Sequence, residues 1–142
     1  MVYALKLFAE AIRSLPTNSL DRPIQIRYWG SSCSEMALSA FSQMGWQAST
    51  QEPGVRLEFF SLPRESHDGV FIEELPHGFS AELVQRVFAA SFQGLRPKGI
   101  LFVGFRDHSP VALLTWLRQS GFQSLQQGQS DELQGILAQR IA

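Results

Sequence analysis

The sequence contains a single cysteine and no apolar run long enough to cross a membrane. Because Cys33 is alone among 142 residues, no intramolecular disulfide can form and no cysteine-based metal site exists within one chain. Three separated histidines show no metal-ligand spacing, so we expect no metal. Residues 1–16 interrupt their apolar positions with charges at helical spacing, which fits neither a signal peptide nor a membrane span. These absences predict a cytoplasmic protein that does not contact a membrane.

The sequence also lacks an excess of either charge. Twelve Lys and Arg against thirteen Asp and Glu give a formal net charge of -1, so there is no global basic field and we expect no nucleic-acid partner. What the chain does have is 44% hydrophobic residues, without a repeat or a low-complexity stretch. This composition and length predict one globular domain over residues 1–142.

Apolar residues at helical spacing predict four helices, each with its own start or stop signal. Proline or glycine follows three of them, and serine precedes the last two at the position that caps a helix. The first helix is expected over residues 2–14, and the second carries Ala37, Ala40, Phe41 and Met44 on its apolar face. The third runs from Ser80 to the "RPKG" turn, and the fourth runs from Pro110 to Gly121.

Short apolar or alternating runs between these helices predict the strands. They are "IQIRYW" (24–29), "WQAS" (46–49), "VRLEFF" (55–60), "GVFI" (69–72), "ILFVGF" (100–105), "FQSL" (122–125) and "GILAQRIA" (135–142). Strands that alternate with helices imply a doubly wound α/β fold with a mostly parallel twisted sheet and helices on both faces. The last two runs predict a closing antiparallel hairpin.

Two acids directly follow the strand expected at 69–72. In an open α/β sheet, ligands bind outside the carboxyl ends of the strands, so Glu73 and Glu74 lie where a functional rim is expected. Adjacent residues point in different directions, so spacing alone does not make the two acids a catalytic pair. We expect one of them to point inward.

One long stretch in the second half of the chain is "HDGVFIEELPHGFSAELVQRVFAASFQGLRPKGILFVGF" (67–105). It resembles the second half of the class I S-adenosylmethionine-dependent methyltransferases, especially the small type 11-like members, in which an "FDxV" strand is followed by a loop with a histidine, a helix, an "LkPgG" turn and a long apolar strand. "LLTWLRQSGFQSL" and "ILAQRIA" are similar to the helix, "aGF" turn and strands that follow. The resemblance covers nearly two-thirds of the chain. It implies a Rossmann-like methyltransferase fold, with S-adenosylmethionine as cofactor and S-adenosylhomocysteine as product.

The glycine loop of this family aligns with "RYWGSSCSEMAL" in the first half. Gly30 matches the first glycine of the family's "GxGxG" loop, Ser32 and Ser34 stand at the other two glycines, and Tyr28 replaces an acid. The resemblance implies that this loop contacts the methionine part of the cofactor, where a serine hydroxyl could donate a hydrogen bond. Alternatively, these serines only cap the following helix.

Two more acids match positions at which the family contacts the rest of the cofactor. Glu52 stands where an acid meets the ribose hydroxyls, and Glu58 stands where an acid meets the adenine amino group. The alternatives are a turn acid at Glu52 and a polar edge-strand position at Glu58. Only residues 51–54 separate the two expected strands, so one helix of the family is missing and these strands can pair in an antiparallel manner.

The resemblance therefore implies a methyltransferase that acts on an unidentified acceptor, with a cofactor pocket over Gly30, Glu52, Glu58 and Glu73. His77 matches the loop histidine and, like Glu74, is a candidate proton acceptor, although a lone loop histidine is often an ordinary surface residue. The chain leaves no room for a dedicated substrate cap. We therefore expect a small-molecule acceptor, a protein acceptor, or a homodimer in which a second subunit completes the site.

Two other functions are compatible with the sequence. One is a degenerate methyltransferase-like module that binds no cofactor and acts through protein contacts, which the serine-substituted loop and the missing helix favour. Glu52 and Glu58 favour the enzyme, because a chain without cofactor has no reason to keep acids at both positions. A nicotinamide-dependent enzyme is the weakest alternative, because such an enzyme also needs a "GxGxxG" loop and this chain has only Gly30 at the matching place.

Overall fold

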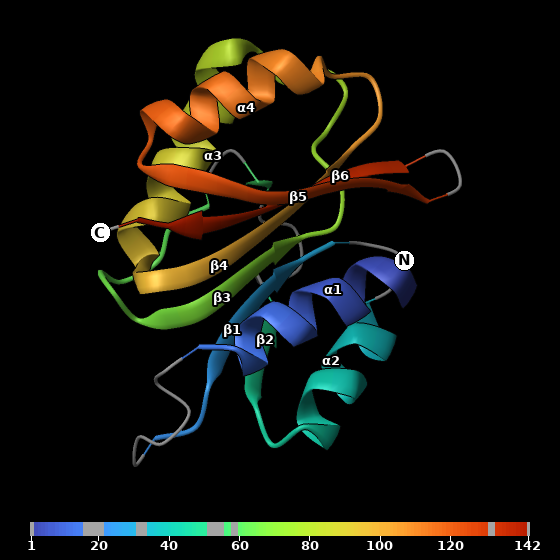
Figure 1. Ribbon diagram of the computed structural model, residues 1–142, viewed down its shortest axis with the longest axis vertical. Coiled ribbons are helices and arrows are strands. Elements are labelled where there is room, and N and C mark those ends of the chain that lie inside the picture. Colours follow the sequence, from blue (N-terminus) through green and yellow to red (C-terminus); the bar gives the residue numbers. More distant parts are fainter. Residues whose placement is uncertain are drawn as a thin grey trace.

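The protein is a three-layer α/β structure in which a six-stranded sheet separates two pairs of helices (Figure 1). A computed structural model describes residues 2–15, 22–30, 34–50, 56–57, 60–130 and 133–141. The helices are α1 (Val2–Arg13), α2 (Ser34–Gln43), α3 (Ala81–Gly94) and α4 (Pro110–Gln119). The strands are β1 (Gln25–Trp29), β2 (Gln47–Thr50), β3 (His67–Ile72), β4 (Leu95–Phe105), β5 (Phe122–Ser130) and β6 (Leu133–Arg140).

The strand order of the sheet is β2-β1-β3-β4-β6-β5. The strands β2, β1, β3 and β4 are parallel neighbours, and β6 is antiparallel to both β4 and β5. This arrangement confirms the predicted α/β fold with a mostly parallel sheet and a C-terminal antiparallel hairpin. The hairpin enters the sheet with its second strand inside, which leaves β5 at one edge and β2 at the other.

One face of the sheet packs against α1 and α2, and its centre is a row of aromatic rings. Tyr28 on β1, Phe71 on β3 and Phe102 on β4 are directly paired across the strands. The Tyr28 and Phe71 ring centroids are 5.4 Å apart with planes 13° from parallel, and those of Phe71 and Phe102 are 4.5 Å apart at 16°. All three rings are buried, so this aromatic ladder binds three strands together under the two N-terminal helices.

The other face of the sheet packs against α3 and α4, with the segment around Leu57, Phe60 and Leu62 beside them. The prediction of a strand over 55–60 is wrong for the residues described there. Leu57 and Phe60 are both buried and lie three positions apart, and the Phe60 amide donates to the Leu57 carbonyl at 2.9 Å. Buried side chains three positions apart, joined by a backbone hydrogen bond between the same two residues, indicate a turn rather than an extended strand.

The predicted antiparallel pairing in this region is also absent from the described residues, because β2 pairs with β1 in parallel. Between β2 and β3, residues 56–57 and 60–66 contain no α-helix, in line with the missing helix expected from the sequence.

The helix boundaries follow the sequence signals closely. The Ser80 and Ser109 side-chain oxygens accept hydrogen bonds from backbone amides at 3.3 Å at the starts of α3 and α4. Gly45 and Gly121 follow α2 and α4 with φ of 80° and 104°, a conformation that disfavours other residues. The strand predicted from Ile100 begins earlier, at Leu95. Its register against β3 shifts near His67, so the "RPKG" segment is an irregular start of β4 rather than a separate turn.

A buried carboxylate joins three strands at the amino-end edge of the sheet. Asp68 Oδ2 accepts the Gln25 amide at 2.9 Å and an Arg96 guanidinium N–H at 3.0 Å, and the Arg22 guanidinium lies 3.7 Å from Oδ1. The neighbouring His67 is buried as well. Burial, aided by Arg27 and Arg96, lowers the pKa of His67 to about 4, so its imidazole is neutral near neutral pH.

Replacing Asp68 tests the strength of this junction. Asp68→Ala removes a buried acceptor that two part-buried donors share, and we expect the free energy of unfolding to fall by roughly 3 kcal/mol. Glu82→Ala is the matched control, because Glu82 pairs with Arg86 at 3.3 Å on the exposed surface of α3. The free energy of unfolding of Glu82→Ala should fall by less than about 1 kcal/mol. Urea denaturation measures both, and equal losses would contradict the role given to Asp68.

Candidate functional site

The carboxyl ends of β1, β3 and β4 meet at one edge of the sheet and carry the candidate site. Gly30 follows β1, Glu73 and Glu74 follow β3, and His77 lies in the loop beyond. The structure therefore brings together four of the eight predicted site residues. Ser32, Glu52 and Glu58 lie outside the described residues, and Ser34 begins α2 with a side chain that is not described.

Glu73 points into the protein and meets Tyr28. Side chains alternate along a strand, so Phe71 and Glu73 lie on the face of the sheet that carries Tyr28. The Glu73 amide donates to the Trp29 carbonyl at 2.8 Å, which extends the pairing of β1 and β3 beyond the end of β3. The Tyr28 hydroxyl donates a hydrogen bond to Glu73 Oε2, and both residues are buried. The inward acid expected from the sequence is therefore Glu73.

Gly30 completes this cluster because the Glu73 carboxylate rests against its backbone. A Cβ atom placed on Gly30 would lie 2.0 Å from Glu73 Oε2 and 2.7 Å from the Tyr28 hydroxyl oxygen. Real Cβ atoms do not approach other atoms so closely. A larger residue at position 30 would have to displace the Glu73 side chain. We call Tyr28, Gly30 and Glu73 the Glu73 cluster.

Glu74 points the other way, toward a partly exposed group of charged side chains. Its Oε2 atom accepts a hydrogen bond from Arg106 Nε at 3.1 Å and lies 3.7 Å from His77 Nε2. His77 Nδ1 lies 2.5 Å from Asp107 Oδ2. We call Glu74, His77, Arg106 and Asp107 the rim network. It holds the His77 ring between two carboxylates at the carboxyl edge of the sheet.

Sequence reasoning missed three of the residues that shape this edge. Arg106 and Asp107 directly follow β4, so inspecting the residue after each strand would have found them. His108 Nε2 donates to the Pro76 carbonyl at 2.9 Å and joins the loops after β3 and β4. The hydrogen bond from Tyr28 had no local signal, because its partner is 45 residues away.

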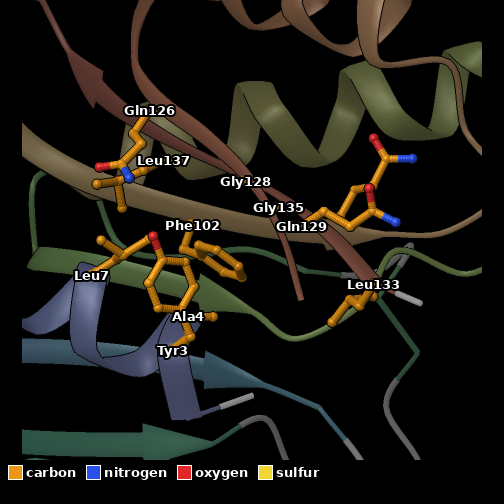
Figure 2. Close-up of a pocket in the computed structure, with 11 residues that line it drawn as sticks. Tyr3, Ala4, Leu7, Phe102, Gln126, Gly128, Gln129, Leu133, Gly135 and Leu137 are labelled. Carbon is orange, nitrogen blue, oxygen red and sulfur yellow. The ribbon is translucent and has the colours of Figure 1, made fainter. Parts of the chain in front are cut away.

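Three cavities in the structure lie away from the Glu73 cluster. One is a groove between α1 and the β5–β6 hairpin (Figure 2), one of about 510 Å³ lies at the opposite end of that face, and one of about 450 Å³ lies between α3 and α4. None of the three is lined by Gly30, Glu73 or Glu74.

The described residues offer neither a metal centre nor a membrane-spanning helix. No group of three or more His, Cys, Asp or Glu side chains there is arranged to hold a metal ion. No helix among them has the length and apolar character needed to cross a membrane.

Comparison with known proteins shows the fold but no close relative. No protein-family model and no curated protein matches this sequence. Among solved structures, the 1,6-didemethyltoxoflavin-N1-methyltransferase of Burkholderia thailandensis, with bound 1,6-didemethyltoxoflavin and S-adenosylhomocysteine, superposes with a TM-score of 0.73. That match has 12% identity and covers 98% of this chain and 79% of the other.

Two more structures show how widely this fold is shared. A putative S-adenosylmethionine-dependent methyltransferase from Listeria monocytogenes has a TM-score of 0.66 at 8% identity, over 99% of both chains. The cyclase SpnF has a TM-score of 0.59 at 11% identity and covers 96% of this chain and 80% of its own. The chain therefore has the Rossmann-like fold of the class I S-adenosylmethionine-dependent methyltransferases. At these identities the likeness shows the fold alone.

A single methyl group at position 30 tests the geometry of the Glu73 cluster. In Gly30→Ala the new Cβ must displace the Glu73 carboxylate, and we expect the free energy of unfolding to fall by about 1 to 3 kcal/mol. Gly78→Ala is the control from a nearby loop, since nothing lies within 4 Å of its Cβ position. Its effect should be below about 0.5 kcal/mol in the same denaturation experiment. If Gly30→Ala is as stable as the parent protein, Glu73 does not pack on Gly30.

Proposed function

We propose that this chain binds S-adenosylmethionine at the carboxyl edge of its sheet and transfers the methyl group to a small-molecule or protein acceptor. One observation carries the proposal. Tyr28, Gly30 and Glu73, from two neighbouring parallel strands, form a buried polar cluster at the edge where such sheets bind ligands. The fold, shared with solved S-adenosylmethionine-dependent methyltransferases, supports the choice of ligand.

The chemistry of the Glu73 cluster fits the methionine end of this cofactor. S-adenosylmethionine carries an ammonium and a sulfonium there, and a buried carboxylate interacts strongly with a cation because the protein interior screens charge weakly. In the resemblance drawn from the sequence, Tyr28 occupies the position of an acid at the end of the first strand. Glu73, directly after β3, meets Tyr28, so a carboxylate is present at this place although it comes from the neighbouring segment of the chain.

The remaining cofactor contacts of the proposal come from the sequence. Ser32 and Ser34 would hold the methionine carboxylate through their hydroxyl or backbone groups, Glu52 the ribose hydroxyls, and Glu58 the adenine amino group. When bound, the cofactor supplies a methyl group to the acceptor and leaves as S-adenosylhomocysteine. The protein's own contribution is mainly to position the two reactants.

The rim network offers a proton acceptor for this reaction. Asp107 can accept the Nδ1 proton of His77, which leaves the lone pair of the ring on Nε2. Glu74, itself held by Arg106, keeps a negative charge near the ring and would stabilise the protonated imidazole. His77 Nε2 could then take the proton that an oxygen or nitrogen acceptor loses, with Glu74 as the second candidate for that role.

A second candidate function is a module that binds no cofactor and acts through protein contacts. The observation that favours it is the position of the Glu73 carboxylate, whose Oε2 lies 2.0 Å from where a Cβ of Gly30 would be. The chain thus fills the space over this glycine with its own side chain. For a ligand to reach the Gly30 backbone, the Glu73 side chain would have to move.

Isothermal titration with S-adenosylmethionine and S-adenosylhomocysteine tests the proposal, with NADH as a negative control. We expect saturable binding of the first two ligands and none of NADH. Glu73→Gln keeps the shape of the side chain but removes its charge, so affinity should fall by at least about tenfold. Glu82→Gln, on the exposed surface of α3, should bind like the parent protein.

Absence of heat with both adenosyl ligands, in protein whose circular dichroism shows an intact fold, would reject the methyltransferase and favour the second candidate. Binding that Glu73→Gln leaves unchanged would place the cofactor away from the Glu73 cluster. Binding of NADH would instead support the nicotinamide-dependent alternative.

A further inference from the structure

The two edges of the sheet differ in how well they are protected. The edge strand β2 has four residues, whereas the edge strand β5 has nine. Natural proteins protect a long edge with charged side chains, proline or a covering element, because its unpaired backbone groups invite another strand. The β5 sequence "FQSLQQGQS" contains neither a charge nor a proline. Its register shift between Ser124 and Gln126 is the only protective irregularity that its pairing with β6 shows.

We propose that β5 pairs with β5 of a second copy of this chain, antiparallel, about a two-fold axis through Gln127. Alternate residues of β5 direct their backbone N–H and C=O groups away from β6, toward the open edge. Pairing two such edges joins the two six-stranded sheets into one. The proposal is independent of methyl transfer, because β5 carries none of the predicted site residues.

The sequence of β5 is complementary to itself about this axis. An axis through Gln127 places Gln126 opposite Gly128 of the second copy. Gln126 and Gly128 lie on the same face of the sheet, since both line the groove beside α1. A long side chain thus faces a glycine at each of two symmetric positions. Like charges never oppose one another, because the strand has none.

The groove beside α1 provides space for the side chain that faces Gly128. Figure 2 shows Tyr3 and Phe102 near one another beside the strands that carry Gly128 and Gly135. The groove encloses about 30 Å³, which suits the end of one side chain rather than a cofactor. A Cβ at Gly128 would meet the Tyr3 ring at 3.7 Å, an ordinary van der Waals contact, so nothing crowds this glycine.

The groove is mainly apolar, and its lining residues are all uncharged. The methylene groups of Gln126 of the second copy would pack against it, and the lining glutamine amides are the polar groups that its own amide could meet. Tyr3 is 48% exposed and Leu125 is 45% exposed. Pairing of the two β5 strands would cover part of both.

Sedimentation equilibrium from about 1 µM to about 1 mM tests this dimer, since a strand-pair interface smaller than the usual protein contact predicts micromolar affinity. We expect the mass of the parent protein to rise toward twice that of the monomer. Gln127→Lys and Gln127→Glu each place two like charges opposite one another on the axis. Each should weaken the dimer by at least about tenfold.

An equimolar mixture of these two variants provides the decisive comparison. The lysine introduced in one copy then faces the glutamate introduced in the other, so the dimer should return. Gln85→Lys, on the exposed surface of α3, is the control for an added charge and should behave like the parent protein. Circular dichroism checks that every variant is folded.

A parent protein that stays monomeric over the whole range would overturn the proposal and leave the β5 edge to a different protein. Two other results would also overturn it. One is dimerisation of the single variants as strong as that of the parent. The other is a mixture that associates no better than either variant alone.

Discussion

The hydrogen bond from Tyr28 to the buried Glu73 carboxylate is the interaction on which the candidate site depends. It joins the ends of β1 and β3, and it sets the Glu73 carboxylate against the backbone of Gly30. Tyr28 also begins the aromatic ladder that continues through Phe71 to Phe102. The polar cluster at the carboxyl edge and the apolar centre of the sheet therefore share one side chain. At the opposite edge, Asp68 ties together the same three strands.

The regular parts of the fold were predictable because their signals are local. Serine caps, helix-ending glycines and the apolar run of β4 lie within a few residues of the elements they define. The segment around Leu57 was mispredicted because its apolar residues alternate in the sequence as they do in a strand. In the structure Leu57 and Phe60, three positions apart, are both buried, which does not fit the two-residue period of a strand. Strand alternation predicted that one of the two adjacent acids points inward, but not which of them. Its contact with Tyr28 could not be predicted, since the two residues are distant in sequence and meet only through strand pairing.

The two candidate functions differ in what the Glu73 carboxylate does. If it accepts a ligand's cationic group, the Glu73 cluster is a binding site and the rim network around His77 has a reaction to serve. If it binds no ligand and stabilises the strand ends through Tyr28 and Gly30, the cluster is a structural junction and the protein acts through contacts with other proteins. The fold does not decide between them, because a cyclase shares it with methyltransferases.

The most direct test is to map where S-adenosylhomocysteine perturbs the backbone amides of the labelled protein by nuclear magnetic resonance. The account predicts shifts at Gly30, Glu73 and Glu74, with the amides of Asp68 and Arg96 at the opposite edge unchanged. Shifts confined to other parts of the chain, or none at ligand concentrations that saturate a methyltransferase used as a positive control, would contradict the claim that the Glu73 cluster is a cofactor site.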